Sequence, residues 1–113
     1  MPRSSYWTRT IPILADETVR ITQKFKIDTR GRAIDFSLVL FVKIDGRWHR
    51  IKRCDATPLH GGVPHCHIYL LRGDVRREIV GAVGDNLGVI VSEIIRDIRQ
   101  RLQSIIDNYR HSR

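Results

Sequence analysis

The stretch Ala33–Cys54, "AIDFSLVLFVKIDGRWHRIKRC", decides the fold of this chain. Its first twelve residues place an apolar side chain at every even position: Ile34, Phe36, Leu38, Leu40, Val42 and Ile44. This period of two is typical of a β-strand with one buried face. Val39 and Phe41 make the other face partly apolar as well, so we expect a central strand. Asp45-Gly46 is a strong signal for a two-residue hairpin, and Arg47–Cys54 is then the returning strand.

The segments on either side extend the same pattern. Residues 17–28 alternate apolar and basic positions and indicate a half-buried strand with a basic outer face. Residues 55–64 hold two prolines and a Gly-Gly pair and are expected to form a loop. Strands are expected again over 65–71 and 75–80. Near the N-terminus, Pro12 limits the apolar run Ile11–Leu14 to an edge strand or an extended segment.

The C-terminal quarter changes period. After Asp85, which is a good N-cap residue, apolar residues recur at spacings of three and four as far as Tyr109. This stripe predicts one helix of about 24 residues, which would span about 36 Å. We therefore expect an α+β fold in which an antiparallel meander of four to five strands carries one long C-terminal helix on one face.

The length of 113 residues suits one domain. We expect an N-terminal arm over residues 1–16, an antiparallel sheet over 17–80 and the C-terminal helix over 85–109. No apolar run is long enough for a membrane span, and the N-terminus lacks the pattern of a secretory signal. We therefore expect a cytoplasmic protein that does not bind membranes, in which Cys54 and Cys66 are reduced, buried thiols.

The charge of the chain indicates the class of partner. Lys and Arg number 20 against 12 Asp and Glu, which gives a net charge of +8. Such a surplus favours a polyanion, and we expect RNA rather than DNA. The residues expected to contact nucleic acid are Arg47, Arg50 and Lys52 on the strand before the loop and Arg72 in the turn after the following strand.

The segment 54–71, "CDATPLHGGVPHCHIYLL", holds three of the five histidines and both cysteines. His65 and His67 are two residues apart on an expected strand and so point to the same face, whereas Cys66 points to the other face and the core. If the strands on either side of the loop pair antiparallel, Asp55 and His65 lie at the same end of the sheet. His60 lies in the loop above that end.

Three chemistries fit this cluster. Metal-independent RNA cleavage needs a base for the 2′-OH, an acid for the leaving 5′-oxygen and a nearby cation, and histidine suits both proton transfers. Alternatively, Asp55, His60, His65 and His67 form a shell for a divalent transition metal, although their spacing matches no strong zinc pattern. In the third case the histidines only stabilise the loop.

The motif Arg53-Cys54-Asp55, followed by His60 and by Pro64-His65-Cys66-His67, resembles a pattern of TumE-like toxins of prokaryotic toxin–antitoxin modules. In that family an aromatic residue stands at the position of Cys54. The resemblance implies a toxin that acts on nucleic acid or translation and that a partner antitoxin neutralises. It extends to Arg53, Asp55, His60, His65 and His67 as site residues.

The lead hypothesis is thus a small basic toxin-like protein that cleaves RNA without a metal. His60 and His65 would be base and acid, with His67 in support, Asp55 as the orienting carboxylate and Arg53 on the phosphate. The alternative is a non-catalytic module that binds nucleic acid through its basic strand face, including His49, and through the aromatic residues Tyr6 and Trp7 of the arm. A third alternative is an interaction subunit in which the long helix and the basic face meet an acidic partner such as an antitoxin. The end of the helix, where it overhangs the sheet, would also suit a homodimer contact.

Overall fold

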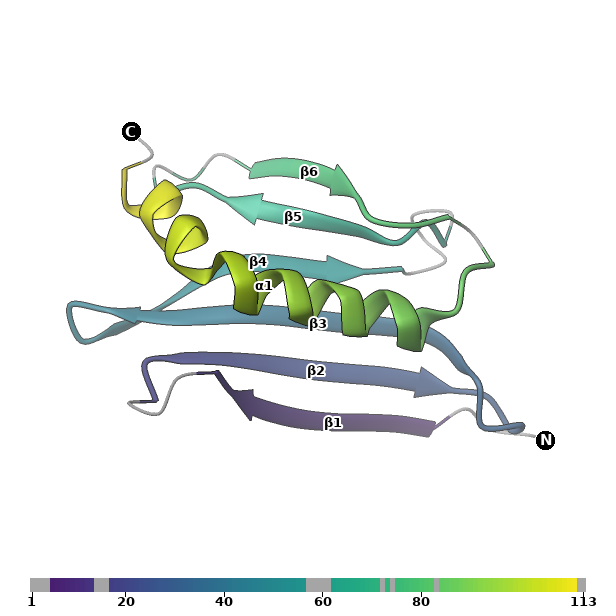
Figure 1. Ribbon diagram of the computed structural model, residues 1–113. Helices are drawn as coiled ribbons and strands as arrows, with labels where there is room; N and C mark the ends of the chain where they lie inside the picture. The colour runs from purple at the N-terminus through teal and green to yellow at the C-terminus, as the bar shows by residue number, and fades with distance from the viewer. Residues whose placement is uncertain are drawn as a thin grey trace.

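The computed structural model describes residues 5–13, 17–56, 62–71, 73, 75–82 and 84–111. They form one open antiparallel sheet of six strands and one helix, with the strands in meander order β1-β2-β3-β4-β5-β6 (Figure 1). The elements are β1 (Ser5–Pro12), β2 (Val19–Ile27), β3 (Ala33–Ile44), β4 (Arg47–Asp55), β5 (His65–Tyr69), β6 (Val75–Ile79) and α1 (Leu87–Arg110). The expected α+β meander with one long C-terminal helix is confirmed.

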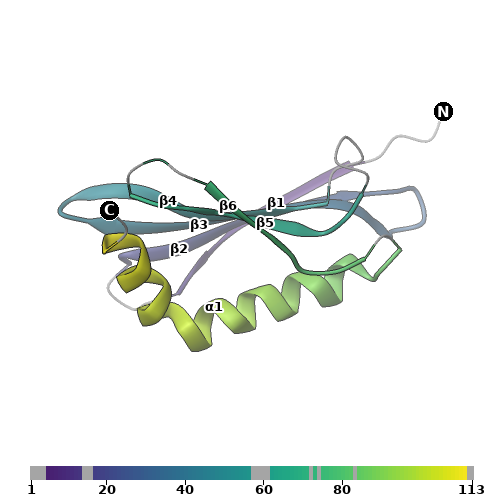
Figure 2. The ribbon, with the colours of Figure 1, turned by 90° about the horizontal axis from the view of Figure 1, so that it is seen from above.

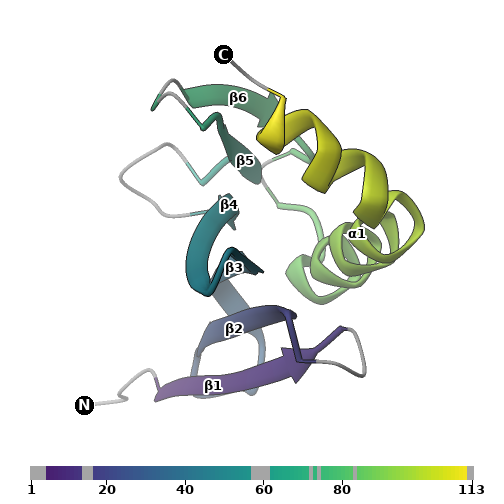
Figure 3. The ribbon, with the colours of Figure 1, turned by 90° about the vertical axis from the view of Figure 1, so that its left-hand side faces the viewer.

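The helix covers one face of the sheet, and no other described element covers the opposite face (Figures 2 and 3). The even positions of β3 face α1, as their alternation predicts: Leu38 and Leu40 are fully buried, and Ile98 of the helix is fully buried as well. Burying side chains of this size from both layers is the main favourable term that holds the helix on the sheet. We call the opposite side the helix-free face.

Three details differ from the expectations. The sheet has six strands because Ser5–Pro12, within the expected arm, pairs with residues 20–27 of β2 as an edge strand. The helix N-cap is Asn86, whose side chain accepts a hydrogen bond from the Val89 backbone N–H. Asp85 instead accepts a hydrogen bond from the Ala82 N–H and so closes the turn before the helix.

The helix is also bent. Arg101 has non-helical backbone angles, and Figure 2 shows the last turns directed back toward the sheet. The hydroxyl of Tyr109 thereby lies 2.8 Å from Nδ1 of His49 on β4. The bend lets a helix of 24 residues remain in contact with the sheet near its C-terminal end.

The cysteines were wrongly expected to be free. Cys54 and Cys66 pair directly across β4 and β5 and form a disulfide. Both side chains are fully buried on the helix side of the sheet, as the alternation of β5 predicts. The sequence places each of them in the core, but only the register shows that they face one another.

Candidate functional site

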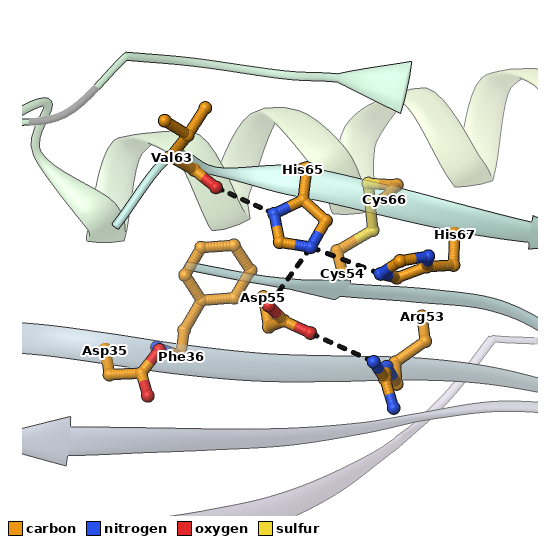
Figure 4. Close-up of polar contacts among 9 residues, drawn as sticks. All are labelled: Asp35, Phe36, Arg53, Cys54, Asp55, Val63, His65, Cys66 and His67. Carbon is orange, nitrogen blue, oxygen red and sulfur yellow. Dashed lines mark hydrogen bonds and ion pairs between the residues drawn. A yellow bond between two sulfur atoms is a disulfide. The ribbon is translucent and has the colours of Figure 1, made fainter. Parts of the chain in front are cut away.

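The candidate site lies where β4 and β5 pair beside the loop that connects them. Asp55 pairs with His65 and Arg53 pairs with His67 in the antiparallel register. Cys54 lies between Arg53 and Asp55 on β4, and Cys66 lies between His65 and His67 on β5. Both cysteines point toward the helix, so the four flanking side chains share the helix-free face. Figure 4 shows the two imidazoles and the Asp55 carboxylate directed toward one another. The sequence permits Asp55, His60, His65 and His67 to converge, and the structure brings Asp55, His65 and His67 together.

The hydrogen bonds of His65 fix its tautomer. Nδ1 of His65 lies 2.8 Å from the Val63 carbonyl oxygen, and because a carbonyl only accepts, Nδ1 must carry a proton. Nε2 of His65 lies 3.1 Å from Nε2 of His67 and 3.4 Å from Oδ1 of Asp55. A neutral His65 that is protonated at Nδ1 has Nε2 as an acceptor, so in the hydrogen bond between the two rings Nε2 of His67 is the donor.

Oδ1 of Asp55 is buried and has no hydrogen-bond partner among the described residues. The other oxygen, Oδ2, lies 3.5 Å from a guanidinium nitrogen of Arg53. A buried carboxylate oxygen without a partner is costly, because it has lost its water and gained no donor. A proton on Nε2 of His65, or a cation among the three side chains, would satisfy it.

The two histidines differ in access. His65 is fully buried, whereas His67 is half-buried. Burial lowers the pKa of His67, and the positive charge of Arg53 and the neighbouring His65 lower it further. His67 is therefore kept neutral at lower pH than an ordinary histidine, which suits a proton acceptor or a metal ligand.

Asp35 is a carboxylate near the site that the sequence reasoning missed. It lies on β3, and Oδ1 accepts a hydrogen bond from the Phe36 N–H at 2.7 Å. Burial raises the pKa of Asp35, and the negative charge of Asp55 raises it further. The signal that could have drawn attention to it is the only acidic residue of a mainly apolar central strand.

A β-bulge decides which basic residues share the face of the site. Leu40 pairs with Lys52 and Phe41 pairs with Arg50, so Ile51 has no partner on β3. The extra residue reverses the alternation of β4. Arg50 therefore lies on the helix-free face together with Arg53, although simple alternation puts residues 50 and 53 on opposite faces.

The other predicted nucleic-acid residues of β4 lie elsewhere. Lys52 is on the helix side, 4% exposed, and borders a cavity of about 120 Å³ together with Glu78 and Arg101. Burial lowers the pKa of Lys52. Arg47 pairs with Ile44 at the hairpin end of the same side, and His49 contacts Tyr109.

The remaining predicted site residues cannot be placed. His60 and Arg72 lie outside the described residues, and so do the side chains of Tyr6 and Trp7. In the part of the chain that the structure describes, Arg53, Asp55, His65 and His67 come together, and Arg50 lies farther along the same face.

Comparisons with protein-family models, with curated proteins and with solved structures find no match to this chain. No helix among the described residues combines the length and hydropathy that a membrane span needs. Function is therefore inferred from the geometry and charge of the site.

Proposed function

We propose that this protein is a small toxin-like ribonuclease that acts in the cytoplasm and is neutralised by an antitoxin protein. The observation that carries the proposal is the cluster of Asp55, His65 and His67 beside Arg53, in a chain of net charge +8. The order of these residues in the motif, which resembles that of TumE-like toxins, supports the toxin part.

The geometry revises the roles of the histidines. His65 is fully buried, so we assign it and Asp55 to positioning: together they orient the imidazole of His67 and stabilise its charge, as a buried carboxylate does in other histidine sites. His67 takes the proton from the 2′-OH of the RNA. Arg53 stabilises the negative charge that develops on the phosphate.

The bond changes are those of an internal transesterification. The 2′-oxygen forms a bond to phosphorus, the bond from phosphorus to the 5′-oxygen breaks, and the 2′ proton passes to His67. We assign the proton for the leaving 5′-oxygen to His60, a prediction from the sequence alone. The products are a 2′,3′-cyclic phosphate and a free 5′-OH, and no co-reactant is required.

The test is cleavage of a fluorescently labelled single-stranded RNA in the presence of EDTA. We expect wild-type protein to yield fragments that end in a cyclic phosphate, and His67→Gln to be slower by about 100-fold or more. His111→Gln is the matched control, because His111 is an exposed residue at the end of α1. A DNA of the same sequence lacks the 2′-OH and should stay intact. Intact RNA with folded wild-type protein would exclude the proposal.

A second candidate function has its own supporting observation. Asp55, His65 and His67 each offer one possible ligand atom within 4.8 Å of the other two, and Oδ1 of Asp55 has no hydrogen-bond partner among the described residues. The observed separations of 3.1 and 3.4 Å are near the roughly 3.3 Å between ligand atoms of a tetrahedral zinc site with bonds of about 2.0 Å. These residues therefore fit a transition metal, which would act as a Lewis acid. Cleavage that EDTA abolishes and Zn²⁺ restores would favour this candidate over the first.

A further inference from the structure

A row of alternating arginine and aromatic side chains crosses the helix-free face beside the candidate site. Arg20 on β2 pairs with Phe41 on β3, and Phe41 pairs with Arg50 on β4. The guanidinium of Arg50 in turn lies over the ring of Tyr69 on β5, 4.5 Å from its centroid. We call Arg20, Phe41, Arg50 and Tyr69 the arginine–aromatic row.

Trp48 extends this row toward the hairpin. The guanidinium of Arg20 lies 4.2 Å from the centroid of the Trp48 ring, and the ammonium of Lys43 lies 6.0 Å from it. Trp48 is 38% exposed, and the buried Nε of Arg20 has no hydrogen-bond partner among the described residues. Trp48 and Arg50 are exposed, and Arg20, Phe41 and Tyr69 are half-buried, so flat cationic and aromatic groups line the surface of this face.

The row lies next to the candidate site. Val39, Arg53 and His67 pair with one another across β3, β4 and β5, and they are the next set of paired residues on this face. Tyr69 is two residues beyond His67 on the same face of β5. Two residues of a strand advance by about 7 Å, which is about two stacked nucleotides of a single strand at roughly 3.4 Å each. A phosphate at Arg53 therefore brings the adjoining bases to the row.

The charge of this face also favours a polyanion. Arg20, Lys43, Arg50 and Arg53 contribute positive charge, and in the described strands the carboxylates of this face belong to Asp35 and Asp55. Those two acids lie at the end of the face where β4 ends, beyond Arg53. The row itself is therefore purely cationic and aromatic, which is the combination that binds single-stranded nucleic acid.

We propose that a single-stranded RNA lies across the helix-free face, with its bases stacked on the arginine–aromatic row and Trp48 and its backbone directed toward Arg53. The inference rests on the proposed function for the identity of the nucleic acid and specifies its class. Unpaired bases can stack on aromatic rings and on guanidinium planes, whereas the bases of a duplex are stacked within the helix. The surface thus selects single strands over duplexes.

The experiment measures binding without turnover. Full-length protein that carries His67→Gln is titrated in EDTA against a labelled 12-nucleotide oligouridine, and fluorescence anisotropy gives the Kd. Trp48→Ala and Arg50→Ala, each in that background, should weaken binding by about 5- to 150-fold, the effect of losing one stacked base. Trp48→Phe keeps a ring and should retain most of the affinity.

Arg99→Ala is the charge-matched control, since Arg99 is exposed on the helix. Equal losses for Arg99→Ala and Arg50→Ala would overturn the inference, because binding would then depend on net charge alone. Equal affinity for Trp48→Ala and the parent protein would overturn it as well. Thermal unfolding of each variant verifies that the protein is folded.

Competition identifies the class of partner. A single-stranded RNA should displace the probe, and an RNA duplex of the same length should displace it more weakly. If polyglutamate displaces the probe as well as single-stranded RNA does, the face is an acidic-protein surface and the inference is wrong. Cleavage is assayed separately, so RNA that binds through the row and is never cut would exclude the ribonuclease and leave this inference standing.

Discussion

The Nε2 atoms of His65 and His67 lie 3.1 Å apart, and the opposite ring nitrogen of His65 is held by the Val63 carbonyl. One imidazole is therefore fixed in place by the backbone, and it presents its remaining nitrogen to the other. This contact joins the two histidines of β5 into one hydrogen-bonded pair, in which His65 is the member that the backbone holds in place.

The pKa of His67 should lie below its ordinary value of 6.5, because burial and then the charge of Arg53 disfavour the imidazolium. NMR titration of the His67 ring should show this midpoint, and Arg53→Gln should raise it. Arg47→Gln, at the far end of β4, should leave it unchanged. A midpoint above 6.5 in the wild type would contradict the burial of this ring.

The same shift gives the sign of the effect of pH on stability. The folded pKa of His67 is below the unfolded value, so the unfolded chain binds the proton first as the pH falls. The contribution of His67 is complete above about pH 6.5 and is lost as the pH falls from there toward the lowered pKa. Denaturant unfolding at several pH values should show a smaller decline over this window in His67→Gln than in the wild type.

Metal binding can be measured without any activity. Zn²⁺ at 100 times its Kd should stabilise the wild type by about 2.7 kcal/mol, which appears as a rise in Tm. Asp55→Asn and His67→Gln should each abolish the rise, and His111→Gln should keep it. Mg²⁺, which prefers several oxygen ligands, should have no effect. A Tm that is unchanged by Zn²⁺, Mn²⁺ and Ni²⁺ would exclude the metal candidate.

The disulfide should contribute measurably to stability. Cys54 and Cys66 are 12 residues apart, and closing a loop of that size in the unfolded chain is worth about 3 kcal/mol in the chain-entropy model. Dithiothreitol should lower the Tm of the wild type but not that of the double variant Cys54→Ala/Cys66→Ala. Alkylation of unfolded, unreduced protein by iodoacetamide would instead reveal free thiols.

The stability of the protein should depend on the buried apolar residues of α1 rather than on its exposed apolar residues. Ile98 is fully buried, whereas Val89 is 53% exposed on the same helix. Ile98→Ala should therefore lower the free energy of unfolding by about 2–5 kcal/mol, while Val89→Ala changes it by about 0.5 kcal/mol or less. Urea denaturation of the two variants makes the comparison, and equal effects would mean that α1 does not pack as described.

Much of the fold follows from the sequence because period and burial are local properties. The even positions of β3, the Asp45-Gly46 turn and the apolar stripe of α1 each identify an element and the side that it buries. The edge strand β1 was harder to predict, since its pairing with β2 depends on a neighbour rather than on its own pattern. The N-cap is Asn86 rather than the expected Asp85, because both residues are suitable caps and only the path of the chain selects between them.

For the site, the sequence by itself determined that His65 and His67 share a face and that Cys66 faces the core, because a strand alternates with a period of two. The tertiary structure decided the rest. The register of β4 and β5 set Asp55 opposite His65 and joined Cys54 to Cys66. The bulge at Ile51 turned Arg50 onto the face of Arg53. Both depend on hydrogen bonds between strands, and such pairings between different segments cannot be read from the pattern of one segment alone.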